Sequence, residues 1–530
     1  MRVFYSFFVC GLLYTLLYVS LYHWWSDIGY HQNFVSRSVP QTIVEKTPVR
    51  RNVLMIVADD LRPQLDVYHD LGLSRQIYDR MVTPNLHDLA RESLVVKNAF
   101  AQYSVCSPSR ASTLTSRRPK TTRVYDLETY WRKSGGDFTT LPQYFKENGY
   151  LTQGIGKVFH HGEASGFNND DASWTHPFFQ ANARYWKGKE KSWRAVSYTD
   201  RRRHPLMDDK VLTESQNALK TLSKEAKMND TNFFLAVGFY KPHLPWIFPE
   251  EFLYQYPKSD IDVAINRFAP RNVPPIAGSH YQELVKYTDI KLYDTHLSGD
   301  YNDTIPIELS KDLRRAYYAC VSYIDHQIGQ LLGTLGALGL ENDTIIAFWG
   351  DHGFILGEYG TWCKHSMFEL AARVPLLLRV PGQTDRGVTT NHLVELVDLF
   401  PTLVDVAGLP PIPPCPEYSR NVTLCTEGSS FASLVHQPQS SIWKTRVFME
   451  QMREREDGMV FGRSVRTKFF RYTEWNSTEN NVPHGKELYN INKDPLQFEN
   501  LAGSVSYEKV EAVLQTLLHK GWAEARNSLQ

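Results

Sequence analysis

Short apolar runs alternate with amphipathic segments along most of the chain, from about residue 50 onward. Five of the runs have the length and apolar character of buried strands: 52–58, 150–156, 233–239, 344–349 and 375–380. Apolar residues recur with the helical period in the segments between and after them: 83–93, 141–148, 212–227, 313–338 and 393–407. This alternation predicts an α/β fold built on a central sheet.

The pattern changes near residue 441, where short strand-like runs replace the alternation. Three such runs, at 446–450, 459–466 and 469–475, precede a helical pattern over 507–526. The chain of 530 residues is also longer than the roughly 250–300 residues at which a single core stops growing. We therefore predict a main domain over 51–440 and a smaller C-terminal α+β domain over 441–530.

The N-terminus has the features of a secretory signal. Arg2 precedes a mostly apolar run over 3–22, so residues 1–27 are predicted to be a signal peptide and 28–50 a polar linker. The run is about 20 residues, long enough to cross a bilayer, and no small-x-small cleavage site follows it. An uncleaved signal-anchor is therefore an alternative, and in both cases the rest of the chain enters the secretory pathway.

Sequons and cysteines agree with an exported protein. Five N-x-S/T sequons predict glycosylation, at Asn229, Asn302, Asn342, Asn421 and Asn476. Cys415 and Cys425 lie in a Pro-rich loop and are the natural disulfide in an oxidising compartment. Cys10 lies in the leader, Cys320 is predicted to be a small core residue, and the role of Cys363 is open.

Charge offers no sign of a nucleic-acid or membrane-surface partner. Lys plus Arg and Asp plus Glu both number 58, which gives a net charge of zero. An anionic substrate must therefore be held by a local pocket rather than by the field of the whole protein.

Charged and imidazole groups follow four of the predicted strands. In open α/β sheets, ligands bind beyond the carboxyl ends of the strands, so these groups are expected to meet at one edge. Taken singly, each has an ordinary structural interpretation, such as a helix cap for the Asp pair. Together, three or four carboxylates favour a hard divalent cation such as calcium. The groups are Asp59 and Asp60, Lys157 with His160, His243, and Asp351 with His352.

A C-x-P-x-R motif begins at Cys106 and ends at Arg110. It resembles the site at which sulfatases convert a cysteine into formylglycine, although alone it could be a buried cysteine beside a helix start. Further strings make the chain resemble the sulfatase family of the alkaline-phosphatase-like superfamily, over about residues 52–501. They lie at 59–63, 141–150, 156–160, 241–243, 393–403 and 494–497.

The resemblance implies a large mixed sheet with helices on both faces, and a set of site residues. Asp59, Asp60, Asp351 and His352, together with residue 106 as formylglycine, would hold one calcium ion. Arg110 would hold the formylglycine, and Lys157 and Lys364 would bind the sulfate oxygens. His160 would assist a hydroxyl of the hydrated aldehyde, which attacks sulfur, and His243 would face the leaving oxygen.

The resemblance also implies partners and a substrate class. Maturation would need a formylglycine-generating enzyme, and the substrate would be a sulfated glycosaminoglycan in the lysosome. The nearest members remove 2-O-sulfate from terminal iduronate of heparan or dermatan sulfate. Phe354 and His365 depart from their pattern at positions that flank the substrate pocket, so the exact sugar stays open.

Two other functions compete with this interpretation. The first is a sulfatase of other specificity or a phosphodiesterase of the same superfamily. Phosphate transfer usually uses Thr or Ser as nucleophile and often two metals, so Cys106 argues against the phosphodiesterase. The second is a membrane-anchored glycan-binding protein that has lost catalysis. Against it, every expected catalytic position is filled.

Overall fold

A computed structural model describes residues 50–68, 80–182, 185, 188–279, 283–293 and 305–527. The predicted leader, nearly all of the predicted linker, Cys10 and Asn302 lie outside these residues. None of the helices in the described ranges is long and apolar enough to cross a membrane.

An eight-stranded mixed sheet forms the centre of the fold. Its order is β10-β2-β9-β7-β1-β5-β3, with β8 paired to β2. β1 pairs in parallel with β5 and β7, whereas β9 runs antiparallel to β7 and β2. The strands are β1 (Asn52–Ala58), β2 (Leu94–Phe100), β3 (Leu151–Gly156), β5 (Phe233–Phe239), β7 (Thr344–Gly350), β8 (Arg373–Val374), β9 (Leu376–Arg379) and β10 (Val388–Glu395).

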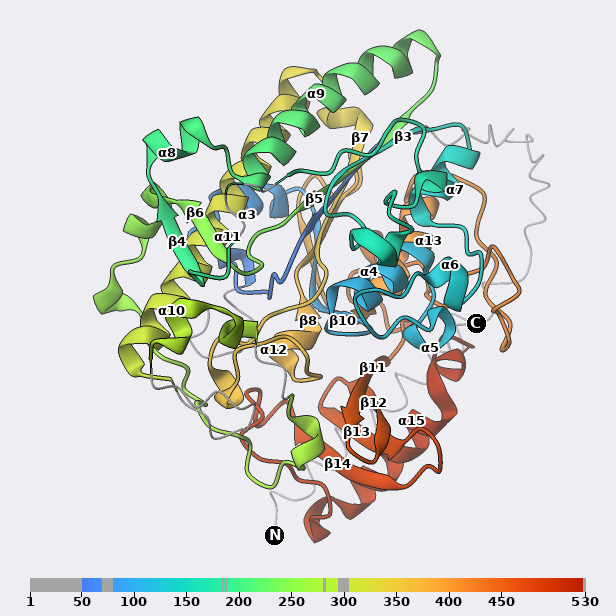
Figure 1. The fold of residues 1–530 in the computed structure, drawn as a ribbon. Helices are drawn as coiled ribbons and strands as arrows, with labels where there is room; N and C mark the ends of the chain where they lie inside the picture. The colour runs from blue at the N-terminus through green and yellow to red at the C-terminus, as the bar shows by residue number, and fades with distance from the viewer. Residues whose placement is uncertain are drawn as a thin grey trace, which may run out of the picture. The chain divides into compact units, whose positions relative to one another are not determined.

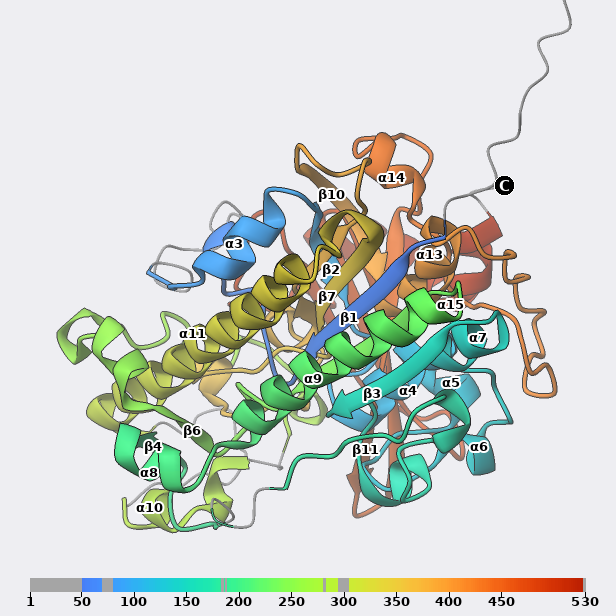
Figure 2. The same cartoon turned by 90° about the horizontal axis from the view of Figure 1, so that it is seen from above.

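Helices cover both faces of this sheet, as Figure 1 shows. Alternate side chains of β1 point to opposite faces: Leu54 and Ile56 enter one apolar core, and Val53, Met55 and Val57 enter the other. The first core is closed by α3 (Pro84–Ala90), α9 (Met207–Met228) and α11 (Ile307–Ala337), and Figure 2 shows α9 beside α11. The second is closed by α4 (Cys106–Thr115), α7 (Leu141–Glu147) and α13 (Leu399–Val406).

The C-terminal part is an antiparallel sheet with one long helix. Strands β11 (Arg446–Arg455), β12 (Gly458–Thr467), β13 (Phe470–Ser477) and β14 (Pro483–Asn490) follow one another in space as in sequence. Leu514 and Leu518 of α15 (Glu508–Asn527) pack on Phe448, Tyr472 and Leu488 of this sheet. The predicted α/β core with a smaller α+β part is confirmed, while the boundary at residue 441 stays a prediction.

The helix predicted over 393–407 begins too early. Leu393 to Glu395 end strand β10, which pairs in parallel with β2, and α13 begins only at Leu399. The apolar run that forms the strand is short, and Glu395 places a charged residue within it. A charged position among apolar ones resembles the pattern of an amphipathic helix. In the structure that carboxylate is buried and accepts hydrogen bonds from Arg118 and Lys444. Six of the described strands were not predicted: β2, β8, β10, β14, and the parallel pair of β4 (Trp193–Val196) and β6 (Trp246–Pro249).

Candidate active site

Cys106 is the first residue of helix α4 and is almost completely buried, at 1% exposure. Its Sγ lies 3.5 Å from Nζ of Lys157, 3.5 Å from Nζ of Lys364 and 3.3 Å from Nε2 of His352. Burial, reinforced by the charge of Asp59, raises the pKa of the thiol far above its usual value. The unmodified side chain is therefore held as a neutral thiol, which is a poor nucleophile.

Three buried carboxylates surround this sulfur. Asp59 and Asp60 follow β1, and Asp351 follows the neighbouring strand β7. Asp60 has a left-handed backbone with φ of 63°, and its N–H donates to Oδ1 of Asp351 at 3.1 Å. This strained conformation turns the Asp60 side chain toward the site.

The donor set fits a hard divalent cation. One ligand atom each from Asp59, Asp351, His352 and Cys106 lie within 4.8 Å of one another, as do those of Asp59, Asp60, Cys106 and His243. Within the described part of the chain, the buried Oδ2 of Asp60 has no hydrogen-bond partner. Carboxylate oxygens at this spacing are the ligands that calcium prefers.

Three cations balance the carboxylates. Arg110 donates from Nη2 to Asp59 at 3.2 Å and from Nε to Asp351 at 2.8 Å. Lys157 pairs with Asp59, and Lys364 pairs with Asp60 at 2.9 Å. Burial alone would raise the pKa of Asp59, but Lys157, together with His243 and Arg110, lowers it well below its usual value.

Two histidines are held unprotonated beside the lysines. Burial, and then the charge of Lys157, lowers the pKa of His160 to about 2. Burial, and then Lys364 and Lys157, lowers the pKa of His243 well below its usual value. The His160 ring also stacks on His161, with centroids 5.0 Å apart. Both rings are therefore neutral in this state, and burial beside the lysines makes them weak bases.

These groups open into one cavity of about 970 Å³. Five of the six predicted catalytic residues line it, and Arg110 lies behind its wall against Asp59 and Asp351. The five are Cys106, Lys157, His160, His243 and Lys364.

Comparison with known proteins agrees with this arrangement. Residues 51–409 match the family model described as Sulfatase, and residues 357–524 match that described as N-sulphoglucosamine sulphohydrolase, C-terminal. The chain belongs to the sulfatase family. Mouse iduronate 2-sulfatase is 37% identical over 513 residues, covering 85% of this chain and 90% of the mouse protein. Human iduronate 2-sulfatase is 37% identical over 525 residues, covering 87% and 92%.

A solved structure shows the same fold. It is a protein in complex with its substrate D-glucosamine-2-N,6-O-disulfate, with a TM-score of 0.67 and 20% identity, covering 90% of this chain and 98% of that one. The predicted enzyme class, a hydrolase of sulfate esters, is confirmed by the family match and the two relatives.

The two residues predicted to contact the substrate of this sulfatase, Phe354 and His365, are not among the residues that line the cavity. Phe354 is completely buried, with its ring packed against Trp246 and Tyr317, and it does not line the cavity. His365 does not line the cavity either, and its carbonyl accepts a hydrogen bond from Arg453. Their contact with the substrate stays a prediction.

Several cavity residues of the sulfatase were not predicted. Glu283 pairs with Lys364 at 3.2 Å, and Lys286 lies one turn further in the same short 3₁₀ helix. Lys241 and Asp208 line the wall beneath His243. Lys241 stands in the string that precedes His243, so its place could have been noted, whereas Glu283 lies in a segment without any recognisable pattern.

Proposed function

We propose that this sulfatase removes 2-O-sulfate from terminal iduronate residues of heparan or dermatan sulfate, using formylglycine made from Cys106 and one calcium ion. The observation that carries the chemistry is the position of the Cys106 sulfur, within 3.5 Å of two ammonium groups and beside three carboxylates. The sugar specificity is supported by the 37% identity to the mouse and human iduronate 2-sulfatases.

Cys106 must be converted before the chain folds. It is 1% exposed, and the whole of α4 from Cys106 to Thr115 is buried. A formylglycine-generating enzyme could reach the thiol only on an extended segment. Once hydrated, the formylglycine supplies one hydroxyl that attacks the ester sulfur and a second that allows sulfate to be expelled.

Calcium would be held by Asp59 and residue 106, which belong to both ligand groups, with Asp351 and His352 from one group and Asp60 from the other. When bound there, it would neutralise charge on the sulfate oxygens and on the nucleophilic hydroxyl. Arg110 spans Asp59 and Asp351 and holds the two carboxylates at a fixed separation.

Lys157 and Lys364 would bind the sulfate oxygens. Both ammonium groups lie beside residue 106, and both side chains are at most 4% exposed. Their charges therefore act in a region of low dielectric, where they stabilise the developing charge strongly. On sulfate binding, Lys157 would weaken its ion pair with Asp59, and Lys364 its ion pair with Asp60, as each contacts a sulfate oxygen.

The two histidines have opposite tasks in this scheme. His160 would accept a proton from a hydroxyl at residue 106, and this step requires negative charge at the site to raise the His160 pKa from its lowered value. His243 would protonate the leaving oxygen of the sugar, which requires the imidazolium form. A bound sulfate ester places negative charge beside the His243 ring, and this charge raises its pKa toward the working range.

The compartment follows from the same proposal. The predicted signal, the five sequons and the Cys415–Cys425 disulfide suit the secretory pathway with the lysosome as destination. The disulfide forms in the structure as predicted, with Cα atoms 4.8 Å apart.

Mass spectrometry and turnover test the proposal together. The chain would be expressed with the formylglycine-generating enzyme, and the tryptic peptide 98–110 examined for an aldehyde at residue 106. An iduronate-2-sulfate disaccharide would then be offered. Aldehyde with turnover supports the proposal, and an unmodified cysteine in an active enzyme would refute the chemistry. Aldehyde with activity only on other sulfated sugars would refute the specificity.

A further inference from the structure

A second cavity, of about 680 Å³, lies between the main domain and the C-terminal sheet. One wall is α5 (Pro119–Thr122) with the loop after it, and another is the loop closed by the Cys415–Cys425 disulfide. Strands β11 and β12 and the end of α15 complete it. It contains none of the residues assigned above to the chemistry.

Its lining is strongly basic, although the whole chain has no net charge. The cationic side chains are Arg118, Lys120, Arg123, Arg420, Arg463 and Lys520, against the two carboxylates of Glu417 and Glu450. Arg118 is committed to Glu395, with two hydrogen bonds of 2.7 Å. Arg420 donates to the carbonyls of Gly135 and Ser134, and Lys520 lies 3.7 Å from Glu524. The excess of cations in the lining still creates a field that attracts anions.

Lys120 and Arg123 are the cations most available to a ligand. Both are exposed, and no carboxylate of the described residues forms an ion pair with either. Arg463 is only weakly engaged, since its Nη2 lies 3.7 Å from Glu474. Three cations on neighbouring elements therefore point to a ligand with several negative groups.

Aromatic rings lie among these cations. Tyr125, Phe448 and Trp522 line the cavity, and Tyr418, which is 87% exposed, stands at its edge. Aromatic side chains beside a few polar groups are typical of sites that bind ring-shaped ligands, because they cover apolar ring faces. The combination suits an acidic sugar better than a lone inorganic anion.

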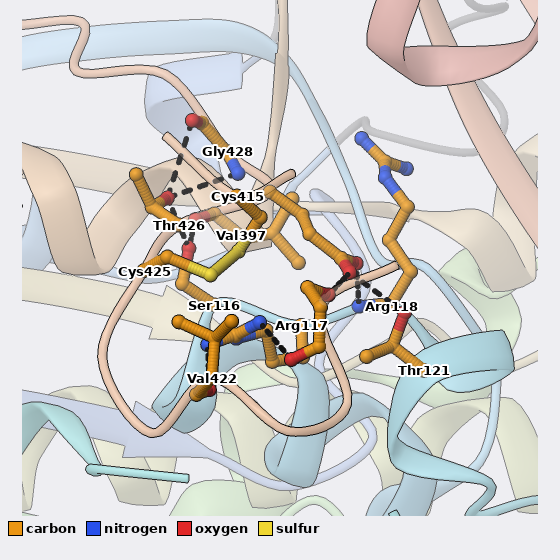
Figure 3. Close-up of a disulfide and its surroundings, with 12 residues drawn as sticks. Ser116, Arg117, Arg118, Thr121, Val397, Cys415, Val422, Cys425, Thr426 and Gly428 are labelled. Atoms are coloured by element: carbon orange, nitrogen blue, oxygen red, sulfur yellow. Dashed lines mark hydrogen bonds between the residues drawn. A yellow bond between two sulfur atoms is a disulfide. The ribbon is translucent and has the colours of Figure 1, made fainter. Parts of the chain in front are cut away.

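The walls are held rigidly together. The side chain of Glu427 accepts hydrogen bonds from the backbone N–H of Arg118 at 2.7 Å and from the hydroxyls of Thr121 at 2.6 Å and Ser419 at 3.1 Å. Figure 3 shows Arg118 and Thr121 beside the disulfide between Cys415 and Cys425. The disulfide loop and α5 thus form one preorganised surface, which lowers the entropy cost of binding.

One segment joins this cavity to the active site. Tyr125 lines the second cavity and Leu127, two residues further on, lines the active-site cavity. Two residues span at most about 7 Å, so the two cavities share a wall. A linear polyanion with its end at Cys106 could extend over this wall.

We propose that the second cavity binds a sulfated stretch of the same polysaccharide whose terminal residue occupies the active site. Lys120, Arg123 and Arg463 would bind its sulfate and carboxylate groups, and the aromatic rings would cover the sugar faces. The proposal rests on the proposed function in taking a sulfated glycosaminoglycan as the polymer.

Equilibrium binding tests it without turnover. The Cys106→Ala protein would be titrated with a heparan sulfate octasaccharide and with a disaccharide that has the same terminal residue. Adding Lys120→Ala and Arg123→Ala should weaken octasaccharide binding about five- to tenfold, as two partly exposed ion pairs would, and leave disaccharide binding unchanged. The matched control, Lys220→Ala with Lys224→Ala on the exposed face of α9, should change neither.

Several outcomes would overturn the proposal. Unchanged octasaccharide affinity in the Lys120/Arg123 variant is one, and an equal loss for both ligands is another, since it would indicate a general charge effect. Asn421 lines the cavity, so its own glycan is a rival occupant. Lys120→Ala with Arg123→Ala could weaken octasaccharide binding only in protein that also carries Asn421→Gln. In that case the Asn421 glycan fills the cavity and the proposal fails.

The proposed function is judged separately. Active enzyme that carries Lys120→Ala and Arg123→Ala should turn over the disaccharide at the wild-type rate. If wild-type enzyme itself does not turn over the disaccharide, the proposed sugar specificity is wrong. The comparison of octasaccharide binding with disaccharide binding still decides the role of the second cavity.

Discussion

Lys364 and Asp60 form an ion pair with 2.9 Å between Nζ and Oδ1, and both side chains are withdrawn from solvent. The same ammonium lies 3.5 Å from the Cys106 sulfur. Asp60 and Lys364, which are 304 positions apart in the sequence, thus meet beside the sulfur of the proposed nucleophile. The pair orders the lysine before any sulfate arrives, and preorganised charge is the main source of electrostatic catalysis.

Lys364→Met should reduce kcat about 10²–10³-fold, the usual cost of removing one preorganised charge from an active site. It also leaves the buried Asp60 and Glu283 without their shared partner, which should lower the free energy of unfolding by about 3–5 kcal/mol. Steady-state kinetics and urea unfolding would measure the two effects. Lys286→Met, at an exposed lysine of the same cavity, is the control and should affect mainly KM. A Lys364→Met enzyme with normal kcat would exclude a role in the chemistry.

Asp208 should make the folded protein more stable in acid. Burial raises the pKa of this carboxyl to about 6, against the opposing effect of Lys241, whereas in the unfolded chain it is about 4. The folded state therefore binds the proton more tightly, and this stabilisation is lost as pH rises from about 4 through about 6. The slope is at most about 1.4 kcal/mol per pH unit. Denaturant unfolding at pH 4.5, 5.5 and 7.5 should show a flatter profile for Asp208→Asn, and identical profiles would contradict the assignment.

The strand-end residues could be predicted because the rule behind them is geometric. Asp59 and Asp351 follow strands β1 and β7, which pair in parallel and in register from Asn52 with Thr344 to Ala58 with Gly350. Any two such residues must meet at the carboxyl edge of the sheet. The apolar runs predicted where the strands lie, and the strand positions in turn predicted that the two carboxylates lie close together.

The remaining features depend on contacts that no local pattern encodes. Glu283 reaches Lys364 from a short 3₁₀ helix, where no periodicity reveals its direction. Phe354 follows the Asp351-His352 pair by two residues, yet its ring turns into the core against Trp246. Glu395 looked like the polar face of a helix because its partners, Arg118 and Lys444, lie 277 and 49 residues away.

Glycans are expected first at the exposed sequons. Asn229, Asn342 and Asn421 are exposed, whereas Asn476 is half-buried on strand β13. A glycan-bearing side chain must reach solvent in the folded protein, so we expect lower occupancy at Asn476. Peptide mapping after enzymatic deglycosylation, which converts occupied Asn to Asp, would measure each position. Full occupancy at Asn476 together with empty Asn229 and Asn342 would contradict this order.

Lys241 should act as a positioning residue for His243. Its ammonium donates to the carbonyls of His243 at 2.5 Å and Pro245 at 2.9 Å, and it is only 9% exposed. Removing it frees the loop that carries the His243 ring, and small displacements of a catalytic group can cost about 10²-fold in rate. Lys241→Met should therefore lower kcat by roughly 10–100-fold, with a smaller change in KM.

The pH profile separates positioning from simple loss of stability. A displaced His243 should shift the pH dependence of kcat, because its burial and its distances to Lys364 and Lys157, which together lower its pKa, would change. Lys241→Arg keeps a donor and a positive charge and should restore part of the rate and the wild-type profile. If Lys241→Met lowers only the melting temperature and leaves kcat and its pH profile intact, Lys241 stabilises the wall without orienting His243.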